Sequence, residues 1–473
     1  MIEAYLEKSS LRQLFLCGQF YTKKKINLDE LSKLLQVCKP TLLNDVKELK
    51  KELENEIIYE ERVKDTCSVY FAPEIPRFLL MQKIARHSLF LKTCQLYLEN
   101  EPDYIQLTEI EYISVSKAYS LKKQVLSYFE NCGIQIIHGS PEFTEIERRL
   151  LLLNVTYRTG TLNMTTLPAG YLTAIDEFIH TLTYNSGRIY NKESQEILRI
   201  GFIIGYLYQK NSPVTIDHDF LQELQKRPIY QYAMTTWQTS QLKNFYQETE
   251  LYFLLILLNL CDYGADCYQA IEEDFLRLHQ VFIEENAQIK QLITRFENYF
   301  NRTFIGNKAF ERAIIRLMRS AWQNYQLFMP EKFYLLTPEQ QDLLVEIQPL
   351  FKQWLTQLPY QLRLNNNCLN AFVIELSGIL RITKTEFHVC IVTNSDVNYL
   401  IYREALEAVK TFDMKVEPVI HSFLNEDLKN FARKDNHRVL CERTLYTPEA
   451  NKIPTIVPIS VDTIEESIIR AIK

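Results

Sequence analysis

Residues 28–51 read LDELSKLLQVCKPTLLNDVKELKK, in which two short amphipathic segments flank a break at residues 38–40. The apolar residues recur at helical spacing before the break, and the helical period restarts directly after it. These apolar positions are Leu31, Leu34, Leu35, Val37, Leu42, Leu43, Val46 and Leu49. Two helices joined by a tight turn predict a helix-turn-helix, in which the second helix lies in the DNA major groove. The alternative is an ordinary helical hairpin with a solvated charged face, because short motifs also match by chance.

The second predicted helix opens with polar side chains of the kind that contact DNA. Hydroxyl and amide groups can hydrogen-bond base edges, while ammonium groups neutralise phosphates. The candidate DNA-binding residues of this segment are Lys39, Thr41, Asn44, Lys47 and Lys50. Lys51 extends the same basic series.

A β-hairpin is predicted directly after this helix. Residues 57–59 and 68–71 are short runs of β-branched and aromatic residues around a polar turn. Such a hairpin is the wing of a winged helix, and its tip would bring Arg62 and Lys64 to phosphates or the minor groove. Residues 23–25 are three lysines, which are expected to form a solvated loop. A first helix that completes a three-helix core is predicted from Leu11, Leu14, Phe15 and Phe20.

The same arrangement recurs in residues 105–130. A short helix carrying Ile110 and Ile113 is followed by a turn, and Ser116 is expected to cap the next helix. Residues 134–137 predict another short wing strand. The candidate DNA-binding residues are Ser116, Lys117, Tyr119, Ser120, Lys122 and Lys123, and the expected buried residues are Leu121, Val125, Leu126 and Phe129. Two such units in tandem favour DNA binding over the simple hairpin.

Composition agrees with a multidomain regulator. The chain has 473 residues, enough for several domains, and its 47% hydrophobic residues exclude global disorder. The formal net charge is −6, so DNA binding would depend on local basic patches. The acidic start at residues 1–4 lacks a signal-peptide core, and the longest apolar run, residues 252–260, is about half of a membrane span. A cytoplasmic protein without membrane contact is therefore expected.

Enzyme chemistry is not predicted. The 10 cysteines include no CxxC pair, and no histidine stands near Cys261 and Cys267 at zinc-finger spacing. Reduced, buried thiols are the expected state. The chain has only 11 glycines and no GxGxxG or GxxxxGK loop. We therefore expect no catalytic residue, no metal and no cofactor.

Residues 165–385 are helical by pattern and are punctuated by prolines. The block divides near residue 275 into halves with comparable helices, which favours a duplicated helical bundle; a single large bundle is the alternative. Representative predicted helices are Tyr171–Thr183, Glu193–Gln209, Glu248–Cys261, Ala270–Phe300, Lys308–Gln326 and Leu369–Arg381.

The last 90 residues or so change character, and strands alternate with helices as in a small parallel α/β domain. The predicted strands are Val389–Val392, Val416–Ile420, Arg438–Leu440 and Pro454–Ile459. The predicted helices are Tyr399–Thr411, Asn425–Arg433 and Thr463–Ile472. The fold class is thus mostly α and multidomain, with a small terminal α/β domain.

This order of modules resembles the Mga-type virulence regulators of Gram-positive bacteria, the family that includes the anthrax toxin activator. The resemblance covers essentially the full chain and rests on the motifs VCKPTLLNDVKEL (37–49), VSKAYSLKKQVL (115–126) and IPTIVPIS (453–460). It implies a winged helix-turn-helix domain in 1–73, a second helix-turn-helix domain in 74–160, phosphotransferase-system (PTS) regulation-like domains in 161–275 and 276–385, and an enzyme IIB-like α/β domain in 386–473.

The resemblance also implies a function. It implies a DNA-binding transcriptional regulator, an activator of virulence or carbohydrate-responsive genes, that binds double-stranded DNA. A homodimer formed through the C-terminal domain is implied, with RNA polymerase and phosphotransferase-system proteins as further partners. A different interpretation is a phosphotransferase-linked signalling protein whose helix-turn-helix units mainly bind other proteins.

Two family features are altered in this chain. Family members are regulated by histidine phosphorylation, and the candidate phosphoacceptors here are His180, His218 and His279, although a lone histidine is more often an ordinary residue. An enzyme IIB active site has a nucleophilic cysteine after its first strand. The corresponding loop here is residues 393–396 (TNSD), and Cys390 is expected to be buried and unreactive within the strand. The tail is therefore predicted to be a dimerisation scaffold, with Leu400, Leu406 and Val409 as candidate apolar contacts.

Overall fold

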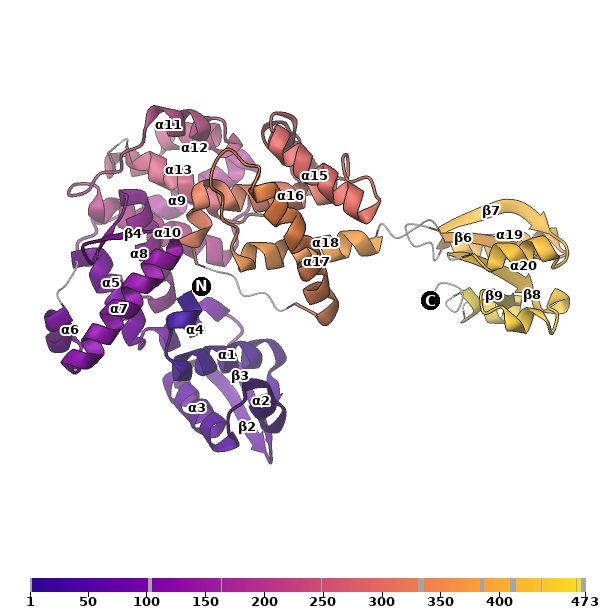
Figure 1. The fold of residues 1–473 in the computed structure, drawn as a ribbon, viewed down its shortest axis with the longest axis horizontal. Coiled ribbons are helices and arrows are strands. Elements are labelled where there is room, and N and C mark those ends of the chain that lie inside the picture. Colours follow the sequence, from indigo (N-terminus) through magenta and orange to yellow (C-terminus); the bar gives the residue numbers. More distant parts are fainter. Residues whose placement is uncertain are drawn as a thin grey trace. The chain divides into compact units, whose positions relative to one another are not determined.

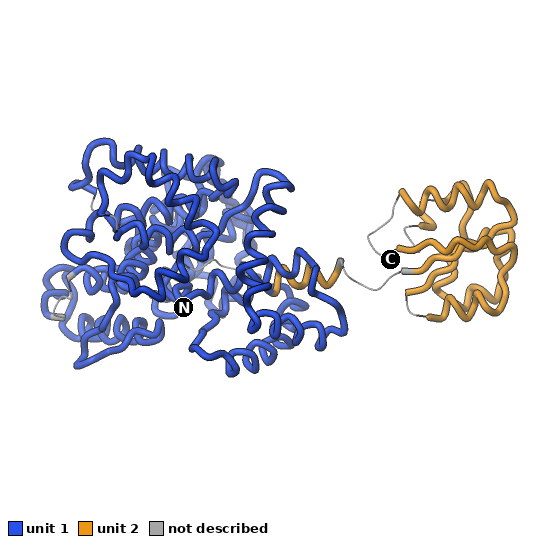
Figure 2. The backbone as a smooth tube through the Cα atoms, turned by 90° about the horizontal axis from the view of Figure 1, so that it is seen from above, with its two compact units in different colours: residues 1–372 blue, residues 373–473 orange. Residues whose placement is uncertain are grey.

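The computed structural model is mostly helical (Figure 1). The chain divides into two compact units, Met1–Phe372 and Val373–Lys473, and the division falls within helix α18 (Asn366–Ile382) (Figure 2). No helix within the described ranges has both the length and the apolar character needed to cross a bilayer. The structure describes residues 2–100, 104–162, 164–247, 249–330, 336–382, 387–408, 414–434, 436–464 and 466–468.

The helices and the hairpin predicted for residues 28–71 are present. The elements are α1 (Lys8–Lys23), β1 (Lys25–Asn27), α2 (Leu28–Leu35), α3 (Lys39–Glu52), β2 (Ile57–Val63) and β3 (Thr66–Phe71). One core joins them, with Leu16, Phe20, Leu31, Leu42, Val46, Leu49 and Val69 among its buried residues. The solvated loop predicted for the three lysines is wrong in part, because Lys25 begins β1 and pairs with Ser68 in β3. The resulting antiparallel sheet has the order β1-β3-β2.

Local interactions set the turn between α2 and α3. The side chain of Asn27 caps α2 by accepting hydrogen bonds from the amides of Asp29 and Glu30. Gln36 ends α2 in the left-handed region, with φ 54°, and the amide of Val37 donates to the carbonyl of Ser32 at 3.1 Å. The left-handed residue and this hydrogen bond together satisfy the C-terminal end of α2 and turn the chain sharply toward α3.

A second two-helix unit with a hairpin follows. It consists of α6 (Tyr104–Ile110), α7 (Val115–Cys132), β4 (Gln135–Ile137) and β5 (Ser140–Glu142). Helices α4 (Arg77–Ala85) and α5 (Leu89–Asn100) precede it, and α8 (Glu145–Thr159) follows it. The prediction that Ser116 caps α7 is wrong: Ser114 does so, accepting from the amide of Lys117, because the helix starts two residues earlier than expected. Ile113 therefore lies in the turn, and Leu126 is only half-buried.

The helical block departs most from its predicted boundaries at two places. The expected continuous helix Ala270–Phe300 is two helices, because a π-helical turn at Gln280–Glu284 ends the first and Asn286 caps the next. The helix expected to reach Gln326 ends at Ala321, since Gln323 and Asn324 adopt φ of 54° and 60°. The predicted start Glu248 lies outside the described residues. The helices are α9 (Tyr171–Ser186), α10 (Lys192–Tyr208), α11 (His218–Gln225), α12 (Pro228–Thr239), α13 (Glu250–Leu260), α14 (Tyr268–His279), α15 (Ala287–Phe300), α16 (Lys308–Ala321) and α17 (Pro338–Leu355).

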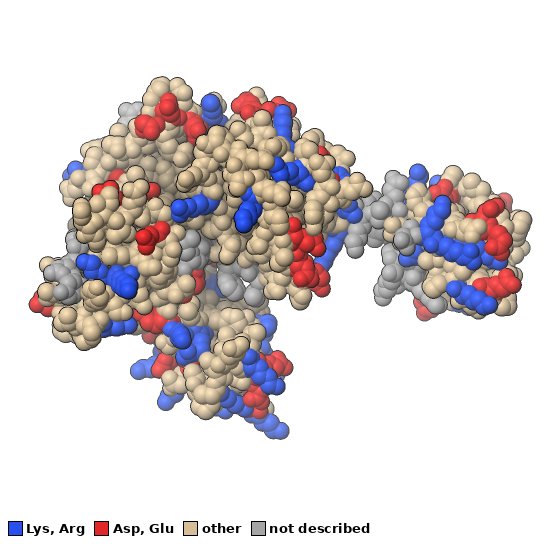
Figure 3. Space-filling model, viewed as in Figure 1, with Lys and Arg blue, Asp and Glu red and all other residues tan. Residues whose placement is uncertain are grey.

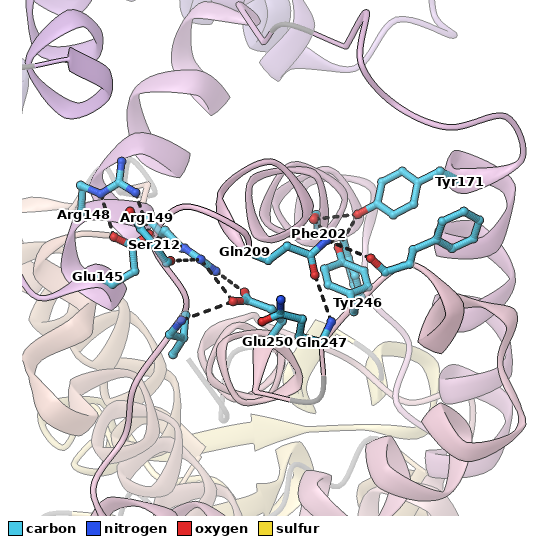
Figure 4. Close-up of polar contacts among 12 residues, drawn as sticks. Glu145, Arg148, Arg149, Tyr171, Phe202, Gln209, Ser212, Tyr246, Gln247 and Glu250 are labelled. Atoms are coloured by element: carbon cyan, nitrogen blue, oxygen red, sulfur yellow. Dashed lines mark hydrogen bonds and ion pairs between the residues drawn. The ribbon is translucent and has the colours of Figure 1, made fainter.

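Helix α8 joins the second two-helix unit to the helical block. Every residue from Arg149 to Thr156 is buried, and α8 packs against α4, α5 and α10. The guanidinium of Arg149 pairs with the carboxylate of Glu250 in α13 and donates to the carbonyl of Ser212 at 2.7 Å (Figure 4). The second unit and the first helices of the block therefore share one hydrophobic core.

The second compact unit contains the predicted parallel α/β domain. Strands β6 (Phe387–Val392), β7 (Met414–His421), β8 (His437–Glu442) and β9 (Ile456–Ile459) form a parallel sheet in the order β7-β6-β8-β9. Helix α19 (Asp396–Ala408) packs on one face of the sheet and α20 (Glu426–Ala432) on the other. The C-terminal ends of the predicted helices Tyr399–Thr411 and Thr463–Ile472 lie outside the described residues.

Candidate nucleic-acid interface

Helix α3 presents a polar face to solvent. Pro40, Asn44, Lys47 and Lys51 are exposed at positions i, i+4, i+7 and i+11. The opposite face is buried, and its Asp45 carboxylate accepts from the Nε of Arg12 in α1 at 2.6 Å. This ion pair fixes α3 against α1, so the exposed face has a defined orientation.

Some predicted DNA-binding groups of this first unit are already paired with carboxylates. The ammonium of Lys39 contacts Asp65 and lies 3.1 Å from Asp29, and the hydrogen bond to Asp65 is the main reason that the pKa of Lys39 is raised. The ammonium of Lys50 lies 2.9 Å from Glu60. DNA contact by these two lysines would require them to exchange a carboxylate for a phosphate.

Other predicted groups of the first unit remain available. Lys47 is exposed, and the described residues place no carboxylate against it. Asn44 is exposed and donates to the carboxylate of Glu48 at 3.0 Å, a local contact that a base edge could replace. Thr41 is half-buried at the start of α3. The exposed outer surface of α3 therefore offers an amide and an ammonium group.

The β2–β3 hairpin places two further basic residues at its tip. Arg62 and Lys64 are exposed, and the Nε of Arg62 donates to the carbonyl of Lys64 at 3.3 Å. Lysine and arginine side chains are visible on the surface of this first unit in Figure 3. Acidic residues accompany them, because Glu60 and Glu61 are exposed on the same strand. The first 73 residues hold equal numbers of basic and acidic residues.

Cys38 stands at the N-terminus of α3. Its side chain does not cap the helix, but its Sγ lies 3.0 Å from the Oγ1 of Thr41. That hydrogen bond is the main reason that the pKa of the exposed Cys38 thiol is lowered. The thiol is thus accessible and ionises more readily than an ordinary thiol, at the end of the helix predicted to contact DNA.

The first turns of α7 are also exposed. Ser116, Lys117, Tyr119, Ser120 and Lys123 are open to solvent, whereas Lys122 is half-buried. This surface is also partly apolar, and its exposed residues include Ile110, Tyr112, Val115 and Tyr119. Tyr112 is 94% exposed. The two units therefore present different chemistry: α3 is polar and flanked by acids, while α7 combines lysines with aromatic and aliphatic groups.

The three candidate phosphoacceptors lie in different environments. His180 is exposed, and His218 is exposed with its Nε2 2.9 Å from the Nε2 of Gln222. His279 has a carboxylate beside each ring nitrogen, because Glu284 lies 3.5 Å from Nδ1 and Glu311 lies 3.5 Å from Nε2. Like-charge repulsion would oppose a phosphoryl group on His279.

The carboxylate of Glu442, at the end of β8, is hydrogen-bonded to the loop that follows β6. Thr393 donates its hydroxyl to Glu442, and the amide of Asn398 donates to the other oxygen of Glu442 at 2.8 Å. Glu442 ends β8, and no local sequence signal marked it. Cys390 is buried within β6, as predicted, and burial raises the pKa of its thiol to about 12. The arrangement opposes phosphoryl transfer at this loop.

In the part of the chain that the structure describes, no three histidine, cysteine or acidic side chains are grouped to hold a metal ion. The comparisons with known proteins are negative: no family model matches this chain. No curated protein matches it either.

Proposed function

We propose that this protein is a DNA-binding transcriptional regulator of the Mga type. The observation that supports the proposal most strongly is the repeated arrangement of two short helices followed by an antiparallel hairpin, in α2–α3 with β2–β3 and in α6–α7 with β4–β5. In both units the first turns of the second helix expose polar side chains, Asn44 in α3 and Lys117 in α7. Each unit is a winged helix-turn-helix in this proposal, and activation of virulence or carbohydrate-responsive genes is its expected role.

The terminal α/β domain serves as a dimerisation scaffold in this proposal. The carboxylate of Glu442 would repel a phosphoryl group at the loop after β6, so the domain has a role other than phosphoryl transfer in this proposal. Among the described strands, β7 at the edge of the sheet pairs with β6 alone, and its Val419 and Ile420 are exposed. Unpaired strand edges with exposed apolar residues favour association with a second copy.

A salt titration of DNA affinity tests the central proposal. The operator would first be identified by mapping bound DNA across the genome of the native host. Lys47 and Lys51 lie on the exposed face of α3. Replacing both with glutamine should therefore reduce the slope of log affinity against log salt by the equivalent of about two phosphate contacts. The matched control is the pair Lys210→Gln and Lys226→Gln, which changes exposed lysines elsewhere.

The salt titration also distinguishes DNA binding from the second interpretation, in which the helix-turn-helix units bind proteins. That interpretation draws support from the exposed apolar surface at Ile110, Tyr112 and Val115. A protein that binds no native-host DNA, or whose affinity is independent of salt, would contradict the DNA-binding proposal. Retention of a partner protein that is lost on Tyr112→Ser substitution would then support the protein-binding role.

We expect the terminal domain to dimerise the protein. Among the candidate contacts, Leu400 is 56% exposed, whereas Leu406 is 0% exposed and packs on its own sheet, so Leu406 is wrong as an interfacial residue. Val409 lies outside the described residues. Sedimentation should show a dimer at micromolar concentration, and Leu400→Glu with Val419→Glu should convert it to a monomer because charges would be buried at the interface.

The control for this prediction is Val461→Glu, which adds the same charge at an exposed apolar residue beyond β9. It should leave the dimer intact. Deleting residues 386–473 should also give a soluble monomer with weaker, less cooperative DNA binding. A full-length protein that sediments as a monomer, or a truncated protein that remains dimeric, would show that the interface lies elsewhere.

A further inference from the structure

Helix α7 exposes large apolar side chains near its N-terminus, whereas α3 does not. Val115 is 57% exposed and Tyr119 is 61% exposed, and the two residues lie about one helical turn apart. The structure describes every residue of α3, and its exposed side chains are those of Pro40, Asn44, Lys47, Glu48 and Lys51. The second helices of the two units therefore present different chemistry to a partner.

The apolar residues of α7 belong to a larger exposed group. Single exposed apolar residues are normal on a protein surface, but a group of them marks an interaction site. Five large apolar residues are exposed between residues 105 and 119, namely Ile105, Ile110, Tyr112, Val115 and Tyr119. The last three lie in the turn before α7 and in its first turns, the part of a helix-turn-helix that contacts base edges.

The exposed face of α7 follows from the helical period. At about 100° per residue, one arc of about 140° holds five exposed residues, which are Val115, Ser116, Tyr119, Ser120 and Lys123. The opposite side of the helix is buried and includes Ala118, Leu121 and Val125. Lys117 and Lys122 lie at the two edges between these faces. Hydroxyl and apolar groups thus occupy the middle of the exposed face, and lysines flank it.

This arrangement matches the major groove of DNA. Residues 115–123 contain three lysines and no acidic residue. Ammonium groups at the edges of the helix suit the phosphates along the two rims of the groove, while the middle of the helix meets base edges. A partner protein with an apolar surface would have no use for lysines on both edges. The charge around the apolar residues therefore favours DNA as their partner.

The start of α7 has a defined geometry. The side chain of Ser114 caps the helix by accepting from the amide of Lys117 at 3.3 Å, so Val115 is the first helical residue. The buried residues on the opposite side fix the rotation of the helix about its axis. Val115 and Tyr119 are therefore held in a fixed direction toward a partner.

We propose that α7 recognises thymine, with Val115 and Tyr119 contacting C5-methyl groups in the major groove. This inference rests on the DNA-binding function proposed above. The thymine methyl is the one methyl group that the four bases present in that groove, and apolar side chains are its usual contacts. The two residues lie about 6 Å apart along the helix axis, and base pairs are spaced by about 3.4 Å. The contacted thymines should therefore be about two base pairs apart.

Replacing thymine with uracil tests the contact, because uracil lacks only the C5-methyl group and keeps the pairing and the charge. The probe is the operator duplex obtained by genomic mapping, synthesised either with thymine or with uracil. The full-length protein is titrated against each duplex by fluorescence anisotropy. Affinity for the uracil duplex should be about fourfold lower for each methyl group contacted, the factor expected for burial of one such group.

The variant Val115→Ala separates methyl recognition from other effects of uracil on the duplex. Val115 is exposed and alanine favours helix, so the variant should fold normally. It should bind the thymine duplex about fourfold more weakly than the wild type and the uracil duplex equally well. The matched control is Val345→Ala, which shortens a valine that is 67% exposed on α17 and should change neither affinity. Lys123→Gln should weaken binding to both duplexes by the same factor.

The outcomes separate this inference from the proposal on which it rests. Equal affinity of the wild-type protein for the two duplexes would overturn methyl recognition while leaving DNA binding intact. An unchanged preference for thymine in Val115→Ala would also overturn the role of Val115. A protein that binds neither duplex would overturn both the inference and the DNA-binding proposal, and the exposed apolar group would then be assigned to a protein partner.

Discussion

Replacing Arg149 with methionine should lower the free energy of unfolding of the first compact unit by about 3–5 kcal/mol. Arg149 and Glu250 are both 0% exposed, and they form an ion pair between α8 and α13 (Figure 4). Without the guanidinium, the carboxylate of Glu250 stays buried with the amide of Val214, at 3.3 Å, as its remaining donor. The carbonyl of Ser212 would lose its donor as well. Urea unfolding followed by circular dichroism measures the loss.

The double variant Arg149→Met with Glu250→Leu is the decisive control. It removes both charges, so it should recover most of the stability lost by the single variant. Arg199→Met is the surface comparison: Arg199 pairs with Asp176 at 3.5 Å, both side chains are exposed, and the loss of this pair should cost about 1 kcal/mol or less. A single variant as stable as the wild type would show that the ion pair does not hold α8 against α13.

The elements that the sequence predicted correctly are those specified by neighbouring residues. The helical period of Leu42, Val46 and Leu49 recurs within one helix, and the hairpin after it needs only a polar turn between two β-branched runs. In the second compact unit, β6 and β8 are buried parallel strands with near-continuous apolar runs, so they were also recognisable. Local breaks were harder, as Gln323 and Asn324 adopt positive φ without a glycine to mark the position.

Interactions between distant residues could not be predicted from the sequence. Arg149 follows Glu145 at i+4, so its local pattern is that of an ordinary surface ion pair on a helix. Only the folded chain brings Glu250, a hundred residues away, to the same guanidinium. The lysine charges of the first two-helix unit are partly neutralised for the same reason, because Lys39 forms an ion pair with Asp65 in the hairpin. The exposed face of α3 was predictable, but the charges available on it were not.

Replacing Asn44 or Lys117 with alanine should weaken binding to the operator by about 1–3 kcal/mol each, if each side chain reads a base. The residues lie in separate units, on α3 and α7, so their effects should add in the double variant. Both are exposed, and Asn44 donates to Glu48, a surface contact whose loss should not unfold the protein. Fluorescence anisotropy with operator DNA measures affinity, and circular dichroism checks the fold. The controls are Asn55→Ala and Lys226→Ala, which change exposed polar residues outside α3 and α7.

Alkylation of Cys38 provides a readout that needs no substitution in the predicted interface. Its exposed thiol stands at the N-terminus of α3, and the hydroxyl of Thr41 lowers its pKa, so iodoacetamide should react with it readily at neutral pH. Cys267 is also exposed and serves as the internal control. If α3 lies in the major groove, operator DNA should slow alkylation of Cys38 and leave Cys267 unchanged. Equal protection of both thiols, or of neither, together with unchanged affinity of the Asn44→Ala variant, would remove α3 from the DNA interface and leave α7 as the contact to be tested.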